Sequence, residues 1–276
     1  MATRSVLRQY GVKACNQEAR YLVAAASGKT VAELLKDMNL YASKQIEECV
    51  IDYTAKRLRG EPVAYITGSW EFYGLPIITT SDVLIPRMDT EVLVDQAKEL
   101  LLGKKMDARI LDLCTGSGCI TCAIGHELPA THLVAVDISS AALDIARRNA
   151  AACKVISRVI FMQTDVLSSP PLGLGEFDMI VANPPYIPSD EIPKLDPSVR
   201  DYEPIWALDG GEDGLRFYRA IIKQWRPLLR VGGYLLFEVG EGQSDAVCEM
   251  FDAAGFESVG TRHDTLGVER VVYGKL

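Results

Sequence analysis

The chain has 276 residues, 48% hydrophobic and 24% charged, which is typical of a soluble globular protein that buries a substantial core. Its net charge of −8 argues against a broad nucleic-acid-binding surface, because such a surface needs an excess of lysine and arginine. No uncharged apolar run approaches the roughly eighteen residues that span a bilayer, and no signal-peptide pattern is present, so we expect a cytoplasmic protein without a membrane segment.

Residues 1–61 are predicted to form a small helical bundle. Three segments begin at good N-cap residues and are predicted as helices: 16–26, 30–38 and 43–59. Their apolar faces consist of Leu22, Leu34, Leu35, Ile46, Val50 and Ile51. Arg4, Arg8 and Lys13, with no acidic residue in 1–17, weakly resemble a transit sequence, but the same residues suit a helix of this bundle.

Residues 62–81 are predicted to be a β-hairpin linker. Segments 63–66 and 70–73 are rich in β-prone residues and flank the turn residues 67–69. Segment 77–80 suits a further short strand.

From residue 82 to 276, strand and helix patterns alternate. The predicted strands are 109–113, 133–137, 159–163, 177–182 and 233–240. The predicted helices are 89–102, 119–128, 139–152 and 214–229. This alternation implies an α/β domain whose parallel sheet is covered on both faces. After a helix at 243–254, strands 256–261 and 269–274 follow each other directly, so we expect an antiparallel hairpin at one edge.

Two motifs suited to binding a nucleoside follow the first two strands of this domain. Residues 114–118 form a glycine-rich turn between a strand and a helix, where backbone N–H groups can approach a ligand closely. Asp137 ends the next strand, about twenty positions after the glycines, and is suited to bind ribose hydroxyls.

The third motif is Asn183-Pro184-Pro185-Tyr186, which directly follows the strand at 177–182. Two consecutive prolines end the strand and fix the course of the backbone. The Asn183 amide oxygen and a nearby main-chain carbonyl can therefore accept both hydrogens of a planar NH₂ group, and Tyr186 can cover one face of that group.

At these motifs the chain resembles the S-adenosylmethionine-dependent methyltransferases. More narrowly, it resembles the protein-(glutamine-N5) methyltransferases of peptide chain release factors, the PrmC/HemK family. Further matching segments are PVAYITG at 62–68, EFYGL at 71–75, LIPRMDTE at 84–91, and YEP at 202–204 continuing to GG at 210–211. The resemblance covers nearly the whole chain. It departs at Cys114, where the family has glycine, and at Met88-Asp89, where the family has Pro-Glu.

The resemblance implies a class I methyltransferase fold. This is a doubly wound, mostly parallel seven-stranded sheet with an antiparallel C-terminal edge hairpin, preceded by an N-terminal helical bundle that is joined through a β-hairpin. The implied domains are a substrate-recognition domain at 1–61, the linker at 62–81 and the methyltransferase domain at 82–276. The implied activity is methyl transfer from S-adenosyl-L-methionine to N5 of the glutamine in the Gly-Gly-Gln motif of release factors, which leaves S-adenosyl-L-homocysteine. Release factors are then the protein partners, and we expect no direct nucleic-acid substrate.

The resemblance also assigns roles to individual residues. The expected cofactor-binding residues are Cys114, Thr115, Gly116, Ser117, Gly118, Asp137, Ile138, Asp165, Val166 and Asn183. Asn183, Pro184 and Tyr186 are expected to be catalytic. Substrate binding is expected of Asn183, Pro184, Pro185, Tyr186 and Arg87. Arg87 has a structural alternative, pairing with Asp89 or Glu91. Asp112 either hydrogen-bonds the glycine turn or contacts the amine of the cofactor.

Other functions fit parts of the same pattern. The enzyme could methylate a glutamine of a ribosomal protein, or the N6 amino group of adenine in nucleic acid, since adenine also presents a planar NH₂ group. A non-catalytic scaffold is a further alternative. Cys119 and Cys122 form a C-x-x-C near Cys114, but the chain has no second Cys/His pair at zinc spacing, so we expect reduced thiols and no metal.

Overall fold

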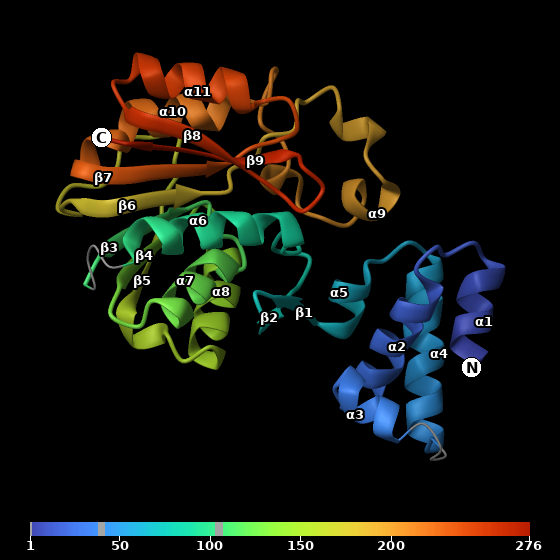
Figure 1. Ribbon diagram of the computed structural model, residues 1–276. Coiled ribbons are helices and arrows are strands. Elements are labelled where there is room, and N and C mark those ends of the chain that lie inside the picture. Colours follow the sequence, from blue (N-terminus) through green and yellow to red (C-terminus); the bar gives the residue numbers. More distant parts are fainter. Residues whose placement is uncertain (1, 38–41, 103–106) are drawn as a thin grey trace.

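The computed structural model describes residues 2–37, 42–102 and 107–276. Figure 1 shows a helical bundle at the N-terminal end, a short β-hairpin, and an α/β unit whose sheet is covered by helices on both faces. The hairpin lies between the bundle and the α/β unit (Figure 1).

The three segments of the bundle that were predicted from N-cap residues are helical, and a fourth helix precedes them. They are α1 (Ala2–Gln9), α2 (Cys15–Ala26), α3 (Val31–Lys36) and α4 (Lys44–Leu58). The predicted end of the second segment, Met38, lies outside the described residues. Leu7 and Leu22 are fully buried in its core. Two predicted core residues are wrong, since Leu35 and Ile51 are 44% and 69% exposed. Their places are taken by Val63 and Ile66, which follow the bundle in the chain.

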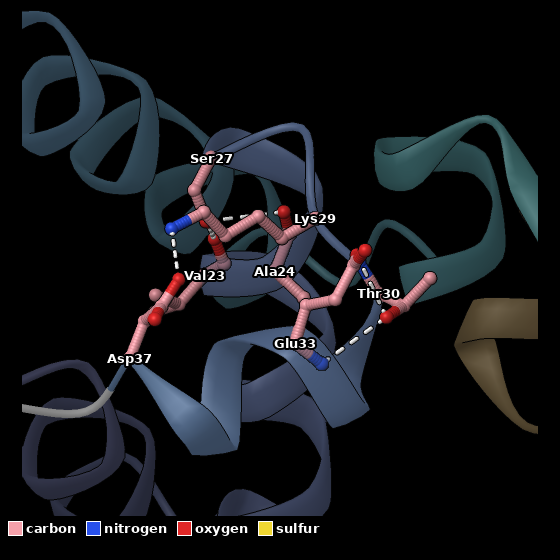
Figure 2. Close-up of polar contacts among 7 residues, drawn as sticks. All are labelled: Val23, Ala24, Ser27, Lys29, Thr30, Glu33 and Asp37. Carbon is pink, nitrogen blue, oxygen red and sulfur yellow. Dashed lines mark hydrogen bonds and ion pairs between the residues drawn. The ribbon is translucent and has the colours of Figure 1, made fainter.

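Polar contacts close the turn between α2 and α3 (Figure 2). Ser27 donates from its hydroxyl to the carbonyls of Val23 and Ala24, which end the helix. Thr30 and Glu33 form a capping box, in which the Glu33 amide donates to Thr30 Oγ1 at 3.2 Å and the Thr30 amide to Glu33 Oε2 at 2.8 Å. Lys29 Nζ lies 2.6 Å from Asp37 Oδ2. In Figure 2 this ion pair joins the residue before the N-cap of α3 to the residue that follows the helix.

The linker contains a hairpin, and the strand predicted at 70–73 is present at Ser69–Phe72, but the strand predicted at 63–66 is not. Residues 63–66 are helical instead, within α5 (Val63–Thr67). Pro62 starts this helix, its carbonyl accepts from the amides of residues 65 and 66, and Gly68 ends it in the left-handed conformation. Burial of Val63 and Ile66 against the bundle thus overrides the β propensity of these residues. The hairpin is β1 (Ser69–Phe72) with β2 (Leu75–Ile78).

The larger unit has the predicted doubly wound sheet. Its strands are β3 (Arg109–Leu113), β4 (His132–Asp137), β5 (Val159–Gln163), β6 (Phe177–Ala182), β7 (Leu229–Glu238), β8 (Glu257–His263) and β9 (Glu269–Lys275). They are ordered β5-β4-β3-β6-β7-β9-β8. The first five pair in parallel, and β9 pairs antiparallel with β7 and β8. This confirms the class I methyltransferase fold with its antiparallel edge hairpin.

Helices cover both faces of the sheet (Figure 1). One face carries α6 (Glu91–Leu101), α7 (Cys119–Glu127) and α8 (Ser140–Ala152), and the other carries α10 (Arg216–Gln224) and α11 (Ser244–Ala253). The helix predicted at 214–229 is shorter than expected. It gives way to the 3₁₀ turn η5 (Arg226–Leu228), which contains Pro227 and leads into β7.

Short elements connect the larger ones. They are the 3₁₀ turns η1 (Met88–Thr90), η2 (Ile156–Arg158), η3 (Ile192–Lys194) and η4 (Ile205–Ala207), and the helix α9 (Pro197–Arg200). Within the described ranges, no helix is long and apolar enough to cross a membrane.

Candidate active site

A cavity opens at the carboxyl ends of β3, β4, β5 and β6. The chain runs from β3 outward to β5 and then returns to place β6 on the other side of β3, so the cavity lies at the topological switch point where such sheets bind ligands. Predicted site residues that line it are Arg87, Cys114, Thr115, Gly116, Ser117, Asp137, Ile138, Asp165, Val166, Asn183 and Pro185. Gly118, Pro184 and Tyr186 do not line it.

Asp112, the fourth residue of β3, holds the glycine turn through hydrogen bonds. This carboxylate is fully buried, and its Oδ2 accepts from the hydroxyls of Thr115 and Thr121, each at 2.6 Å. Burial raises the pKa of Asp112 to about 6. The other oxygen, Oδ1, has no hydrogen-bond partner within the described residues. Of the two roles that the sequence left open for Asp112, the structure supports hydrogen bonding to the turn.

Glycine is required at Gly118 for two reasons. Its φ is +76°, and a Cβ atom there would lie 2.9 Å from the Cβ of Ala146 on α8. Gly118 therefore lets α7 and α8 pack closely. It faces α8 and does not line the cavity. Gly116, with φ +54°, has open space in front of it.

Two carboxylates lie at the ends of the neighbouring strands. Asp137 accepts from the Gly116 amide at 2.8 Å and from the Ser139 amide at 2.9 Å. Burial raises its pKa. Asp165 accepts from the Leu167 amide at 2.9 Å. Each carboxylate oxygen can accept more than one hydrogen bond, so both side chains retain capacity toward the cavity.

Asn183 lies at the cavity wall, immediately after β6. Its Nδ2 donates to Thr90 Oγ1 at 3.2 Å, and among the described residues no group donates to its Oδ1. The acceptor atom of this amide is therefore the one left available for a ligand.

The backbone of Tyr186 lies in a cradle of glycines. A Cβ on Gly210 would come within 2.7 Å of Tyr186 Cα, and one on Gly214 within 2.3 Å of the Tyr186 carbonyl oxygen. Gln243 adds a clamp, since its Nε2 donates to that carbonyl at 2.9 Å and its Oε1 accepts from the Gly240 amide at 3.0 Å. The course of the Asn-Pro-Pro-Tyr loop is thus fixed by packing as well as by its prolines.

Arg87 lines the cavity, but its carboxylate partner differs from both predicted ones. Its Nη2 lies 2.5 Å from Oε1 of Glu203, a 5% exposed residue whose Oε2 accepts from the Ile85 amide at 3.1 Å. Asp89 pairs with Arg270, and Glu91 accepts from the Tyr73 amide. The predicted pairing of Arg87 with Asp89 or Glu91 is therefore wrong, because Arg87 pairs instead with Glu203, a carboxylate more than a hundred positions away in the sequence.

Of the thiols near the turn, Cys119 is buried and Cys114 is half-buried at the cavity wall. Burial raises the pKa of Cys114 well above its ordinary value, and it raises the pKa of Cys119 to about 12. All seven cysteines are free thiols. No group of three or more potential metal ligands occurs within the described residues. A reactive thiol near the turn would need a lowered pKa, and none of these observations provides one.

Several residues near the cavity were not predicted. Thr90 and Trp206 line it, and Glu203 orients Arg87. Glu238, the last residue of β7, lies next to Asn183, because Phe237 pairs with Ala182 in the sheet. Thr90 and Glu203 occur in the segments that resemble the methyltransferase family, but nothing in their local patterns indicates a contact with the cavity.

Two family models match this chain. The methyltransferase small domain matches residues 88–193, and the PrmC N-terminal domain matches residues 2–68. A release factor glutamine methyltransferase of Geobacter sulfurreducens is 39% identical over 99% of this chain and 94% of its own length. One of Caulobacter vibrioides is 37% identical over 99% of this chain and 93% of its own length.

Among solved structures, the hMettl16 catalytic domain in complex with MAT2A 3′UTR hairpin 1 is similar in fold. It has a TM-score of 0.60 at 16% identity, with 82% of this chain and 78% of that chain covered. At this identity the similarity concerns the fold alone.

Proposed function

The chain belongs to the release factor glutamine methyltransferase family, and from this premise we propose that it methylates N5 of the glutamine in the Gly-Gly-Gln motif of peptide chain release factors. The methyl donor is S-adenosyl-L-methionine, and release factors are the protein partners. The observation that supports this most strongly is Asn183, whose free amide oxygen lies on the same cavity as the glycine turn and Asp137.

The residues that line the cavity fit this methyl donor in their chemistry. Asp137 and Asp165 are suited to accept from ribose hydroxyls and from the adenine amino group, and Ile138 and Val166 form apolar walls for the adenine ring. The carboxylates of Asp137 and Asp165 favour a ligand that carries positive charge. When bound, S-adenosyl-L-methionine supplies an electrophilic methyl group and leaves as S-adenosyl-L-homocysteine.

The loop at 183–186 has the features needed to orient an amide nitrogen. An amide nitrogen is a poor nucleophile because its lone pair is delocalised into the carbonyl. If Asn183 Oδ1 and the Pro184 carbonyl accept both N–H hydrogens, they orient the nitrogen toward the donor and stabilise the positive charge that develops on it. The N-methylated cation is strongly acidic and then releases its proton to water, so we assign no general base.

The domain division is part of this proposal. We assign recognition of the release factor to residues 1–61, the link to 62–81 and methyl transfer to 82–276. Tyr202 supports a direct connection between the first and last parts, because its hydroxyl donates to the Arg59 carbonyl at 2.9 Å. A cytoplasmic location is also proposed, and it is consistent with the free cysteine thiols.

The test is methyl transfer with labelled S-adenosyl-L-methionine and three separate acceptors: a release factor, ribosomal proteins and DNA. We expect the label on the release factor, with mass spectrometry locating it on the Gly-Gly-Gln glutamine. A release factor with that glutamine replaced by alanine is the matched control and should remain unlabelled. Label on ribosomal protein or DNA alone would overturn the proposed substrate.

A further inference from the structure

Glu238 is a buried carboxylate that the mechanism above does not use. It ends β7, is 2% exposed, and its Oε2 has no hydrogen-bond partner within the described residues. Burying a carboxylate with an unpaired oxygen is costly, so native proteins contain few such groups. Its position next to the reacting loop suggests a reason for this one.

Glu238 and Asn183 lie side by side because their strands are neighbours in the sheet. β6 and β7 run parallel with Ala182 opposite Phe237, and each of the two residues directly follows one of these partners. Thr90, itself 2% exposed, lies between α6 and this pair and accepts from Asn183 Nδ2 at 3.2 Å. Burial raises the pKa of Glu238 to about 7, and hydrogen bonding with Thr90 and Asn183 acts in the opposite direction.

An asparagine amide must be held in one of two orientations. With Oδ1 toward the cavity, the amide accepts a hydrogen bond from the substrate NH₂ group. With Nδ2 toward the cavity, its own N–H groups face those of the substrate, and no hydrogen bond can form. An ionised Glu238 only accepts, so the Thr90 hydroxyl donates to it and the Thr90 oxygen remains an acceptor. The Thr90 oxygen then accepts from Asn183 Nδ2, as it does at 3.2 Å in the structure, and this orientation of the amide leaves Oδ1 for the substrate.

We propose that Thr90 and Glu238 are positioning residues that fix the orientation of the Asn183 amide for methyl transfer. This inference rests on the proposed function, since it assigns the atom that Asn183 presents to the substrate.

The arrangement predicts how the methylation rate changes with pH. When Glu238 is protonated, it can donate to Thr90, and the Thr90 hydroxyl can then donate to Asn183 Oδ1, which allows the amide to turn over. Activity is therefore expected above the pKa of Glu238 and should fall as the pH drops through about 7. The charged and titratable groups around Glu238 are Asp89, Arg270, Tyr186, Tyr218 and Cys119.

The first test replaces Thr90 in the full-length protein. Thr90→Val keeps the shape and removes the hydroxyl, so the single-turnover rate on a release factor should fall about tenfold or more, as expected for a lost hydrogen bond in the transition state. Thr90→Ser should restore most of the rate. Thr131→Val is the matched control, since Thr131 is equally buried, its hydroxyl donates to the Leu128 carbonyl at 2.8 Å, and it lies outside the cavity lining.

Calorimetry with S-adenosyl-L-homocysteine separates the two proposals. Wild-type affinity in Thr90→Val together with a slow rate supports the positioning role. A wild-type rate in Thr90→Val overturns it while leaving the proposed function intact. Absence of both binding and methylation in the wild-type protein would overturn the proposed function, and the positioning role with it.

The second test does not depend on the folding of Thr90→Val. In the wild-type protein the rate at saturating substrates should decline below pH about 7, and in Glu238→Gln it should be lower and independent of pH in that range. The same decline in Glu238→Gln would assign the titration to another group and overturn the role of Glu238.

Discussion

At the scale of single residues, Asn183 is where substrate binding and chemistry meet. Asn183→Ala removes one of the two proposed acceptors for the reacting NH₂ group, and we expect the methylation rate to fall about 10²–10³-fold. Single-turnover kinetics measure this rate, and calorimetry should show nearly unchanged affinity for S-adenosyl-L-homocysteine. Asn183→Asp should be similarly slow, because a carboxylate has no hydrogen to donate to Thr90 and adds negative charge near the sulfonium. A wild-type rate in Asn183→Ala would leave the loop without its proposed role.

Cys114 stands where a glycine is expected, and its φ is +60°. A side chain in this conformation costs about 1 kcal/mol or more, so Cys114→Gly should be more stable than Cys114→Ala by about that amount in urea unfolding. Because burial raises the pKa of the thiol, we expect no nucleophilic role and unchanged turnover in both variants. A large loss of turnover in both variants, with the fold intact, would restore a function for the thiol.

Single residues also mark the limit of what the sequence predicts. Asp137 and Asn183 could be assigned to the cavity because Asp137 ends, and Asn183 directly follows, a strand of clear pattern. Arg87 could be assigned too, but not its partner Glu203, because their contact depends on how the long loop after β6 folds back. Glu238 lies within the strand predicted at 233–240, yet only the strand order places it next to Asn183.

At the scale of elements, local pattern was sufficient for three strands of the sheet, of which β3 and β6 are largely buried and β5 is only partly buried. The strands at 109–113, 159–163 and 177–182 agree with β3, β5 and β6 to the residue. It failed at 63–66, where β-prone residues form helix α5 because the bundle buries them in that conformation. Propensity is a weak guide for so short a segment, and tertiary packing decides it.

The glycine cradle around the Asn-Pro-Pro-Tyr loop gives a prediction at this scale. In Gly214→Ala, φ is +72° and the new Cβ would lie 2.3 Å from the Tyr186 carbonyl oxygen and 2.6 Å from Gln243 Nε2. We expect a loss of about 2–4 kcal/mol in the free energy of unfolding and a strongly reduced methylation rate. Gly267→Ala is the matched control: its φ is +83° with no atom within 4 Å of the new Cβ, so it should cost only about 1 kcal/mol. Equal losses in the two variants would show that backbone strain alone accounts for the effect.

At the scale of the whole molecule, the order of the parts could be predicted but not how they pack together. The hairpin at 69–78 resembles a linker in sequence, yet Phe72 and Ile77 belong to the same core as α6 and β3. Asn149 on α8 is fully buried and pairs with both backbone groups of Ile78, accepting from its amide at 2.7 Å and donating to its carbonyl at 3.1 Å. The sequence did not predict this contact, because the two residues are 71 positions apart.

This packing predicts how two truncated chains will differ. A chain of residues 69–276 retains the hairpin, whereas one of residues 82–276 leaves Asn149 partly unpaired and exposes the surface that Phe72 and Ile77 cover. Each buried apolar side chain is worth about 1.5–3 kcal/mol, and an unpaired buried amide costs about 1–3 kcal/mol, so we expect the shorter chain to melt much lower or not to fold. Thermal melting measures this difference, and calorimetry should detect S-adenosyl-L-homocysteine binding by the longer chain.

Both chains lack the bundle and should lose methylation of an intact release factor. Equal melting temperatures would show that the hairpin is a mere linker, and full activity of 69–276 on the intact protein would remove the recognition role from the helical bundle.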